Sequence, residues 1–171
     1  MVKYVCVCLL MLAFAAPAFA QDYAQFEISL GYGNIGVKGL EGRHSGFTTH
    51  QTFNLNSVLG IENYIGYYGF GTDPVLGKTQ MFTDIFGARA NYRKWGPTLY
   101  GIAGLGGGFL RFPDTGYGSN NSLAFRVGGG ADFPIHDSLA IKVDVSRASF
   151  HFNGWHSGMN ISTGLVLKIS Q

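Results

Sequence analysis

Residues 122–146, SLAFRVGGGADFPIHDSLAIKVDVS, alternate between apolar and polar side chains with a period of two. Arg126 and Asp132 stand at even-numbered positions in the first half, and Lys142 and Asp144 stand at even-numbered positions in the second half. A period of two predicts β-strands whose two faces differ in polarity. Such strands turn their apolar face either toward a protein core or toward lipid. The apolar row comprises Leu123, Phe125, Val127, Ala131, Phe133, Leu139, Ile141, Val143 and Val145.

The first twenty residues have the composition of a secretory leader. A short basic start precedes an apolar run, and small residues end this run at Ala20. This order is typical of a cleaved signal peptide. We therefore expect a signal peptide at residues 1–20 and a single domain at residues 21–171. Both cysteines, Cys6 and Cys8, lie in the leader, so neither a disulfide nor a thiolate metal site is expected in the exported chain.

The composition of the chain favours a membrane protein without membrane helices. Charged residues make up only 13% of the chain, about half the usual share, whereas 15% are aromatic and 26 residues are glycine. After the leader, no apolar run approaches the ~20 residues that a membrane helix needs. In lipid, a closed barrel is the other structure that pairs every backbone group. The exported chain has 11 basic and 10 acidic residues, a balance that gives no reason to expect a nucleic acid partner.

Eight segments alternate in this way, each about ten to fourteen residues long. A tilted strand needs ~9–11 residues to cross the hydrocarbon layer, whereas strands of soluble proteins commonly have only ~5–6. Long and short connections alternate between the segments, as in outer-membrane barrels with short periplasmic turns. The sequence therefore predicts an all-β fold, an eight-stranded antiparallel up-and-down transmembrane β-barrel. The predicted strands are residues 23–33, 45–54, 58–70, 79–92, 98–111, 122–133, 139–149 and 157–169.

The same alternation places charged side chains inside the barrel. An eight-stranded barrel is only just wide enough for side chains to fill it, and an unpaired buried charge is strongly unfavourable. We therefore expect a salt-bridged lumen network that plugs the barrel. A narrow or gated small-solute pore, with space beside Gly128 and Gly130, remains the alternative. The predicted lumen charges are Glu27, Glu62, Arg89, Arg126, Asp132, Lys142, Asp144 and Lys168.

Aromatic residues gather near the predicted strand ends, as in the two girdles of membrane barrels. The glycine-rich fifth segment, residues 98–111, has too few side chains to fix which of its residues face outward. The girdle at the short turns would comprise Phe53, Tyr92, Trp95 and Phe133, and the girdle at the long loops Tyr32, Phe47, Tyr67, Tyr68, Phe82, Phe109 and Phe150.

Two stretches resemble the small outer-membrane β-barrel proteins that include the OmpA-like transmembrane domains: FRVGGGADFPIHDSLAIKVDVSR (125–147) and GPTLYGIAGLGGGF (96–109). The segment STGLVLKIS (162–170) is similar to the terminal strand signal read by the outer-membrane assembly machinery, although it lacks the usual terminal aromatic residue. The resemblance implies an OmpA-like or OmpW-like, porin-like protein of the Gram-negative cell envelope. Its role would be structural or at the cell surface, with lipopolysaccharide and the assembly machinery as partners. A monomer without cofactor, metal or catalytic residues is expected.

Two other classes of protein stay open on the sequence. One is a soluble periplasmic or secreted barrel that binds a hydrophobic ligand, as lipocalins do; it would need apolar residues inside. The other is a barrel enzyme that modifies lipid A. His136 and Ser138 have a spacing that suits such an enzyme but fall in a predicted periplasmic turn, whereas His156 and Ser157 are adjacent and would point to opposite faces of a strand. The last predicted loop also groups His151 with His156, where a surface metal site is the alternative to an ordinary solvated loop.

Overall fold

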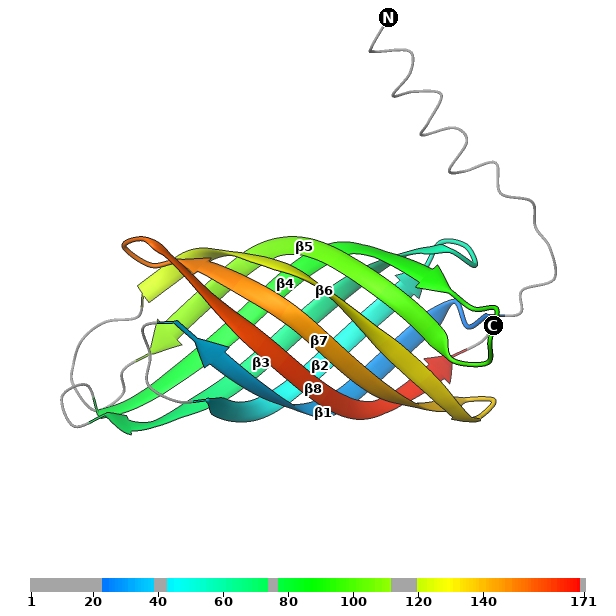
Figure 1. Cartoon of the computed structure of the whole chain (residues 1–171), viewed down its shortest axis with the longest axis horizontal. Helices are drawn as coiled ribbons and strands as arrows, with labels where there is room; N and C mark the ends of the chain where they lie inside the picture. Colours follow the sequence, from blue (N-terminus) through cyan, green and yellow to red (C-terminus); the bar gives the residue numbers. More distant parts are fainter. Residues whose placement is uncertain (1–22, 39–42, 74–76, 112–119, 170–171) are drawn as a thin grey trace, which may run out of the picture.

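The computed structural model describes residues 23–38, 43–73, 77–111 and 120–169. The predicted signal peptide lies outside these ranges. Eight antiparallel strands form a closed barrel in chain order (Figure 1). Within the described ranges, no helix is long and apolar enough to span a membrane. The strands are β1 (Phe26–Val37), β2 (His44–Asn54), β3 (Leu59–Asp73), β4 (Gly77–Tyr92), β5 (Thr98–Arg111), β6 (Asn120–His136), β7 (Leu139–His151) and β8 (Trp155–Ile169).

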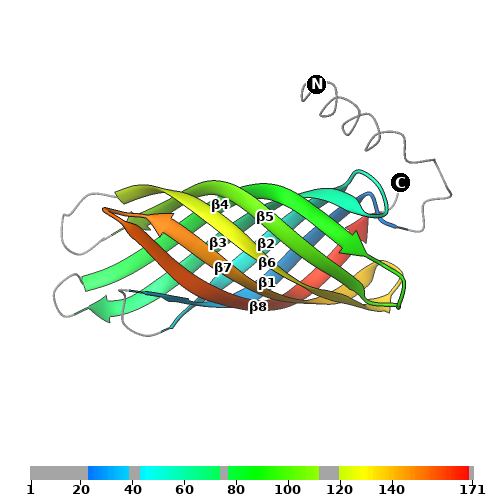
Figure 2. The ribbon, with the colours of Figure 1, turned by 45° about the horizontal axis from the view of Figure 1, so that its top comes forward.

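The barrel closes between its first and last strands. Pairing of β1 with β8 runs from Phe26 opposite Ile169 to Val37 opposite Gly158. Each remaining strand pairs with its neighbour in sequence, so neither sheet edge is left open (Figure 2). The predicted eight-stranded antiparallel up-and-down barrel is confirmed.

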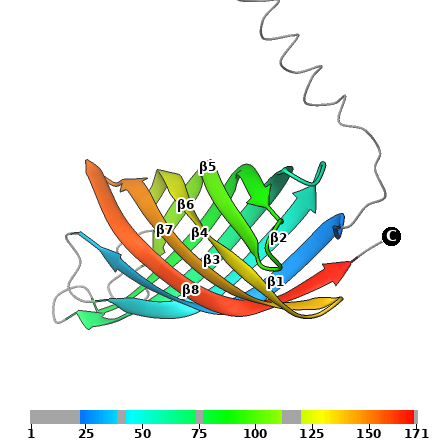
Figure 3. The ribbon, with the colours of Figure 1, turned by 45° about the vertical axis from the view of Figure 1, so that its right-hand side comes forward.

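Short connections gather at one end of the barrel, here called the turn end. There β1 begins beside the end of β8 (Figure 3). The β2–β3 turn is fixed by Asn56, whose side-chain oxygen accepts hydrogen bonds from the backbone N–H groups of Val58 (2.8 Å) and Leu59 (2.7 Å). Asn often organises a turn in this way, because its side chain can replace a backbone acceptor.

The opposite end, here called the loop end, carries the other four connections. Residues 39–42, 74–76 and 112–119 belong to three of them and lie outside the described ranges. The fourth connection is tighter than predicted, because β7 continues to His151 and β8 already begins at Trp155. Asn153 (φ 48°) and Gly154 (φ 140°) turn the chain there in conformations that most residues avoid. His151 and His156 therefore belong to strands rather than to a shared loop.

The two faces of the wall differ in polarity as the alternation predicts. On the outside, Leu30 is 67% accessible and Val127 59% accessible. On the inside, Glu62 and Asp144 are 0% accessible. A soluble barrel with a hydrophobic ligand needs the opposite arrangement, with apolar residues inside and charges in water. The outer wall therefore matches lipid as its solvent.

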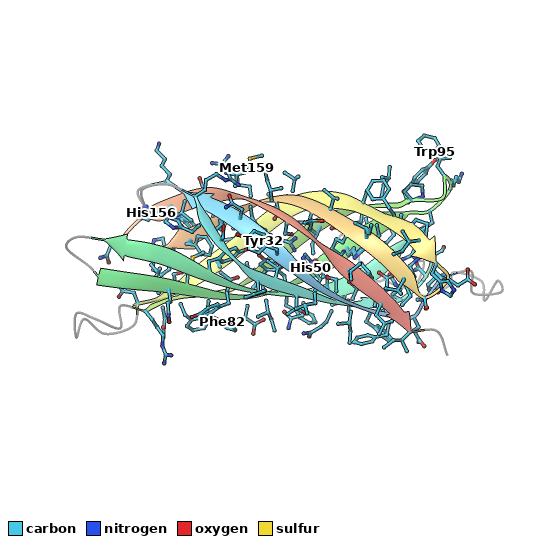
Figure 4. The ribbon with its side chains drawn as sticks, turned by 90° about the horizontal axis from the view of Figure 1, so that it is seen from below. Tyr32, His50, Phe82, Trp95, His156 and Met159 are labelled. Atoms are coloured by element: carbon cyan, nitrogen blue, oxygen red, sulfur yellow. The ribbon has the colours of Figure 1, made fainter. Side chains whose placement is uncertain are left out.

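Two aromatic residues contradict the girdle prediction. Tyr68 and Phe150 are completely buried and face the lumen. Of the other predicted girdle residues, Trp95 lies at the turn end, and Phe82 lies on the outer surface toward the loop end (Figure 4). The orientation of β5, which the sequence left open, places Leu105 outside and Tyr100 inside.

An apolar cluster fills the half of the lumen nearest the loop end. Phe150 from β7, Ile35 from β1 and Met81 from β4 are its largest apolar side chains, and all three are almost fully buried. Phe152, just after β7, packs against the cluster, with its ring 6.0 Å from that of Phe150. The cluster consists of Ile35, Val37, Tyr64, Tyr68, Met81, Ile85, Leu110, Ala124, Ala148 and Phe150.

Candidate functional site

The half of the lumen nearest the turn end holds a network of paired charges. Seven of the eight predicted lumen charges are at most 4% accessible and belong to it. The network contains equal numbers of acidic and basic groups, so that its formal charge is zero with His50 neutral. Its acidic residues are Glu27, Glu62, Asp132 and Asp144, and its basic residues are Arg89, Arg93, Arg126 and Lys142.

Glu62 on β3 lies at the centre of this network. Its Oε2 accepts a hydrogen bond from Nη1 of Arg89 (3.1 Å), and its Oε1 accepts one from Nη1 of Arg126 (3.0 Å). His50 Nδ1 lies 2.9 Å from Oε1, and the Thr52 hydroxyl donates to Oε2 at 3.3 Å. One carboxylate therefore joins two guanidinium groups from β4 and β6. Hydrogen bonds that carry charge are about twice as strong as neutral ones.

Each of these two arginines also binds a second carboxylate. Nη2 of Arg89 is 2.5 Å from Oδ2 of Asp132, and Nη2 of Arg126 is 2.8 Å from Oδ1 of Asp144. The ammonium group of Lys142 lies 3.1 Å from the other oxygen of Asp132. Arg89 and Asp132 are 43 residues apart in sequence, and Arg126 and Asp144 are 18 residues apart. Full pairing is the condition under which charges can be buried at moderate cost.

Amide side chains extend the network to the turn end. Asn54 donates to Oε1 of Glu27 (3.1 Å), and its own oxygen accepts hydrogen bonds from Asn91 and Arg93, both at 3.0 Å. Glu27 forms looser ion pairs, at 3.6 Å with Arg93 and 3.8 Å with Arg89. Lys168, the eighth predicted lumen charge, is only half-buried. It lines a recess of about 430 Å³ at the mouth, together with Glu27 and Arg93.

Aromatic rings fill the space between the charged groups. The Arg89 guanidinium lies 3.9 Å from the centre of the Tyr100 ring, and Lys142 Nζ lies 4.2 Å from it. Gly130 makes room for this ring, because a Cβ at that position would come within 2.6 Å of the Tyr100 hydroxyl. A Cβ at Gly128 would collide with Ser146. Neighbouring side chains therefore fill the space beside Gly128 and Gly130 that the pore interpretation expected to be free.

A layer of hydroxyl and amide groups lies between the charges and the aliphatic residues of the apolar cluster. Tyr64 and Tyr68 are joined through their hydroxyl groups. The Tyr68 hydroxyl donates to Oδ1 of Asn160 (3.0 Å), and Asn160 Nδ2 donates to the Tyr64 hydroxyl (3.3 Å). The Arg126 guanidinium of the charge network lies 4.2 Å from the centre of the Tyr64 ring. Going from the turn end to the loop end, the lumen thus changes from charged to polar to apolar.

Sequence reasoning missed several members of the network. His50 and Arg93 were not predicted as members, and neither was Tyr100, whereas Tyr64 was expected to face inward. The second strand, HSGFTTHQTFN, has few aliphatic residues to mark its outer face. The alternation of Thr48, His50 and Thr52, all of which are buried, was the available signal.

The catalytic and metal candidates from the sequence do not form a reactive arrangement. His136 Nδ1 lies 3.3 Å from the Ser138 hydroxyl, but both residues sit at the turn end on the water side. Ring nitrogen Nδ1 of His156 lies 3.2 Å from the backbone oxygen of Lys38. In the described part of the chain, no three His, Cys, Asp or Glu residues are grouped as metal ligands.

Known proteins share this architecture. A family model, the outer membrane protein beta-barrel domain, matches residues 6–168. Neisserial surface protein A, NspA, is similar in structure, with a TM-score of 0.70 and 14% identity over 85% of this chain and 98% of that one. OprG from Pseudomonas aeruginosa is similar with a TM-score of 0.60 and 11% identity over 88% of this chain and 98% of that one. Ail, the attachment invasion locus protein of Yersinia pestis, has a TM-score of 0.58 and 19% identity over 85% of this chain and 99% of that one. No curated protein matches the sequence significantly.

Proposed function

The chain belongs to the outer membrane protein beta-barrel domain family, and on that premise we propose that it is a closed structural barrel with a surface role. The protein resides in the outer membrane of a Gram-negative bacterium. In this family the short turns face the periplasm and the longer loops face outward. The turn end is therefore periplasmic and the loop end extracellular.

The filled lumen is the observation that carries this proposal. Paired charges occupy the periplasmic half, and the apolar cluster around Phe150 occupies the extracellular half. The charge network takes a structural role here: it fills the interior and holds β1, β3, β4, β6 and β7 together. An ion would have to separate buried ion pairs and then pass an apolar layer, and both steps are costly.

The proposed role needs no catalytic residue, because it consists of spanning the membrane and presenting the extracellular end for contact. Lipopolysaccharide would surround the extracellular half, and the assembly machinery would insert the chain as a monomer. The tightly paired lumen charges support this role over catalysis, since general acids and bases must be free to exchange protons with a substrate.

Conductance in planar lipid bilayers tests the proposal. The purified, folded wild-type barrel is expected to give no steady ion current. Glu62→Ala and Arg126→Ala should also give none, because the apolar cluster stays in place. Combining Glu62→Ala with Met81→Ala and Phe150→Ala removes part of both layers and should open a measurable current. Steady wild-type conductance that changes in the two single variants would instead establish a pore lined by the network.

A second experiment addresses the surface role directly. A strain without this protein should become more sensitive to detergents, and the wild-type gene should restore resistance. A variant whose residues 112–119 are replaced by a short glycine–serine linker keeps the barrel but changes an extracellular connection. Loss of surface contact with intact detergent resistance in this variant would separate the two parts of the role. Unchanged envelope and contact properties in the deletion strain would contradict both.

A further inference from the structure

A groove of about 550 Å³ crosses the outer wall of β6, β7, β8 and β1 near the extracellular end. Its apolar sides are formed by Val127, Val145 and Met159. Met159 projects from the outer surface on the side away from Phe82 (Figure 4). Gly36 lies opposite Met159 in the sheet, so the wall has no side chain there. The groove is therefore a hollow in a surface that otherwise consists of apolar side chains.

Three cationic side chains surround this hollow. Arg147 and Lys38 line it directly. Arg43 reaches across β1, where its Nη2 donates to the backbone oxygens of Asn34 (2.9 Å) and Met159 (3.5 Å). Among the residues described as lining the groove, none is acidic. Two positive charges therefore line the hollow, and a third lies beside Met159, on a wall that faces lipid, where an isolated charge is costly.

The direction of Arg147 shows at which depth these charges lie. Its Nη2 donates to the Ser157 hydroxyl at 2.8 Å. Ser157 pairs with Ser149, two residues beyond Arg147 along β7 toward the extracellular end. Trp155, still closer to that end, contacts the ring of Phe125 at 5.6 Å, as expected of an interfacial aromatic. Arg147 thus extends from the hydrocarbon region up to the headgroup level, as long basic side chains do in membranes.

We propose that this groove binds a phosphorylated glycolipid of the outer leaflet, with Arg147, Lys38 and Arg43 holding a phosphate group of lipid A. The apolar sides below the cations would accommodate an acyl chain, and the Ser157 hydroxyl would face the sugar. Guanidinium groups bind phosphate oxygens through paired hydrogen bonds. The inference depends on the proposed outer-membrane placement, but not on whether the lumen is closed.

The test measures which lipid stays bound to the folded barrel. The protein is placed in nanodiscs of phosphatidylethanolamine that contain either lipid A, dephosphorylated lipid A or phosphatidylglycerol, and the retained lipids are counted by native mass spectrometry. The variants are Arg147→Gln, Lys38→Gln combined with Arg147→Gln, and Arg147→Lys. Lys94→Gln is the matched control, because Lys94 is an exposed cation on the periplasmic β4–β5 turn. Heat-modifiable migration in SDS gels verifies folding of each variant.

Wild type and Lys94→Gln should retain lipid A equally. The double variant should lose about tenfold, since hydrogen bonds between charged groups are typically worth that much or more, and Arg147→Lys should recover part of the loss. Dephosphorylated lipid A should not be retained. Equal retention by wild type and the folded double variant would overturn the inference. Equal retention of phosphatidylglycerol would show a general anionic-lipid surface and would overturn it as well. A barrel that conducts ions but retains lipid A would contradict only the proposed function.

Discussion

Glu62→Gln should destabilise the barrel more than any other single charge-neutralising change in the lumen. Glu62 is completely buried and binds Arg89 and Arg126 at 3.1 and 3.0 Å. Glutamine has nearly the same shape, so the substitution removes the negative charge without creating a cavity. The network then has one positive charge in excess in a buried interior.

The expected loss follows from the two arginines that share this carboxylate. Removing one partner of a buried ion pair costs about 3–5 kcal/mol. Arg89 retains Asp132 and Arg126 retains Asp144, so we expect the lower limit, about 3 kcal/mol. This corresponds to more than a hundredfold in the unfolding equilibrium constant, at about 1.4 kcal/mol for each factor of ten. Glu27→Gln provides the control, because the ion pairs of Glu27 are longer, at 3.6 and 3.8 Å, so we expect a smaller loss there.

Urea titration of the barrel folded into lipid vesicles measures both values. The fluorescence of Trp95 and Trp155 reports unfolding, and a shift in gel migration without heating reports the folded fraction independently. A loss below about 1 kcal/mol for Glu62→Gln, or a loss equal to that of Glu27→Gln, would refute the central position of Glu62 in the network. Combining Glu62→Gln with Arg126→Met should recover part of the loss, since both charges of one pair are then removed.

Three further predictions test the packing of the wall and lumen. Phe150→Ala should cost about 3–5 kcal/mol through a cavity in the apolar cluster, whereas Phe86→Ala on the lipid side should cost less in the same urea titration. Gly46→Ala should lower the folding yield, because a Cβ there would collide with the Tyr67 carbonyl, while Gly69→Ala meets nothing within 4 Å and should fold normally. Leu30→Arg should destabilise the vesicle-bound barrel by about 2–4 kcal/mol; a soluble barrel would tolerate this change on its surface.

Strand number and orientation could be predicted because alternation is a local property of the sequence. On β7 each inward Lys142 or Asp144 lies between outward aliphatic residues, so one strand alone fixes its own faces. The same reasoning fails on β5, where glycines replace the side chains that would distinguish the faces. It also fails for Tyr68 and Phe150, because an aromatic residue near a strand end suits both a lipid girdle and the lumen.

The pairing inside the lumen could not be predicted, because it depends on strand neighbours across the barrel. Arg126 and Glu62 are 64 residues apart in sequence and belong to β6 and β3, which are not adjacent strands. Their contact follows from the barrel's small diameter and from the stagger of its strands. Alternation alone therefore identified the buried charges but not their partners, and it gave no indication that Lys168 would remain at the periplasmic mouth.

These charges contribute to the choice of register as well as to stability. Shifting one strand by a single residue moves its inward side chains to the outside. For β6 this would transfer Arg126 and Asp132 into the hydrocarbon layer, at about 2.5–3.5 kcal/mol or more for each charge at the membrane centre, and would leave Asp144 and Lys142 without their ion-pair partners. An apolar lumen would allow the same shift at much lower cost, since both faces of the strand would then suit lipid. A charged lumen therefore penalises a misregistered barrel even if its ion pairs add little to the stability of the correct one.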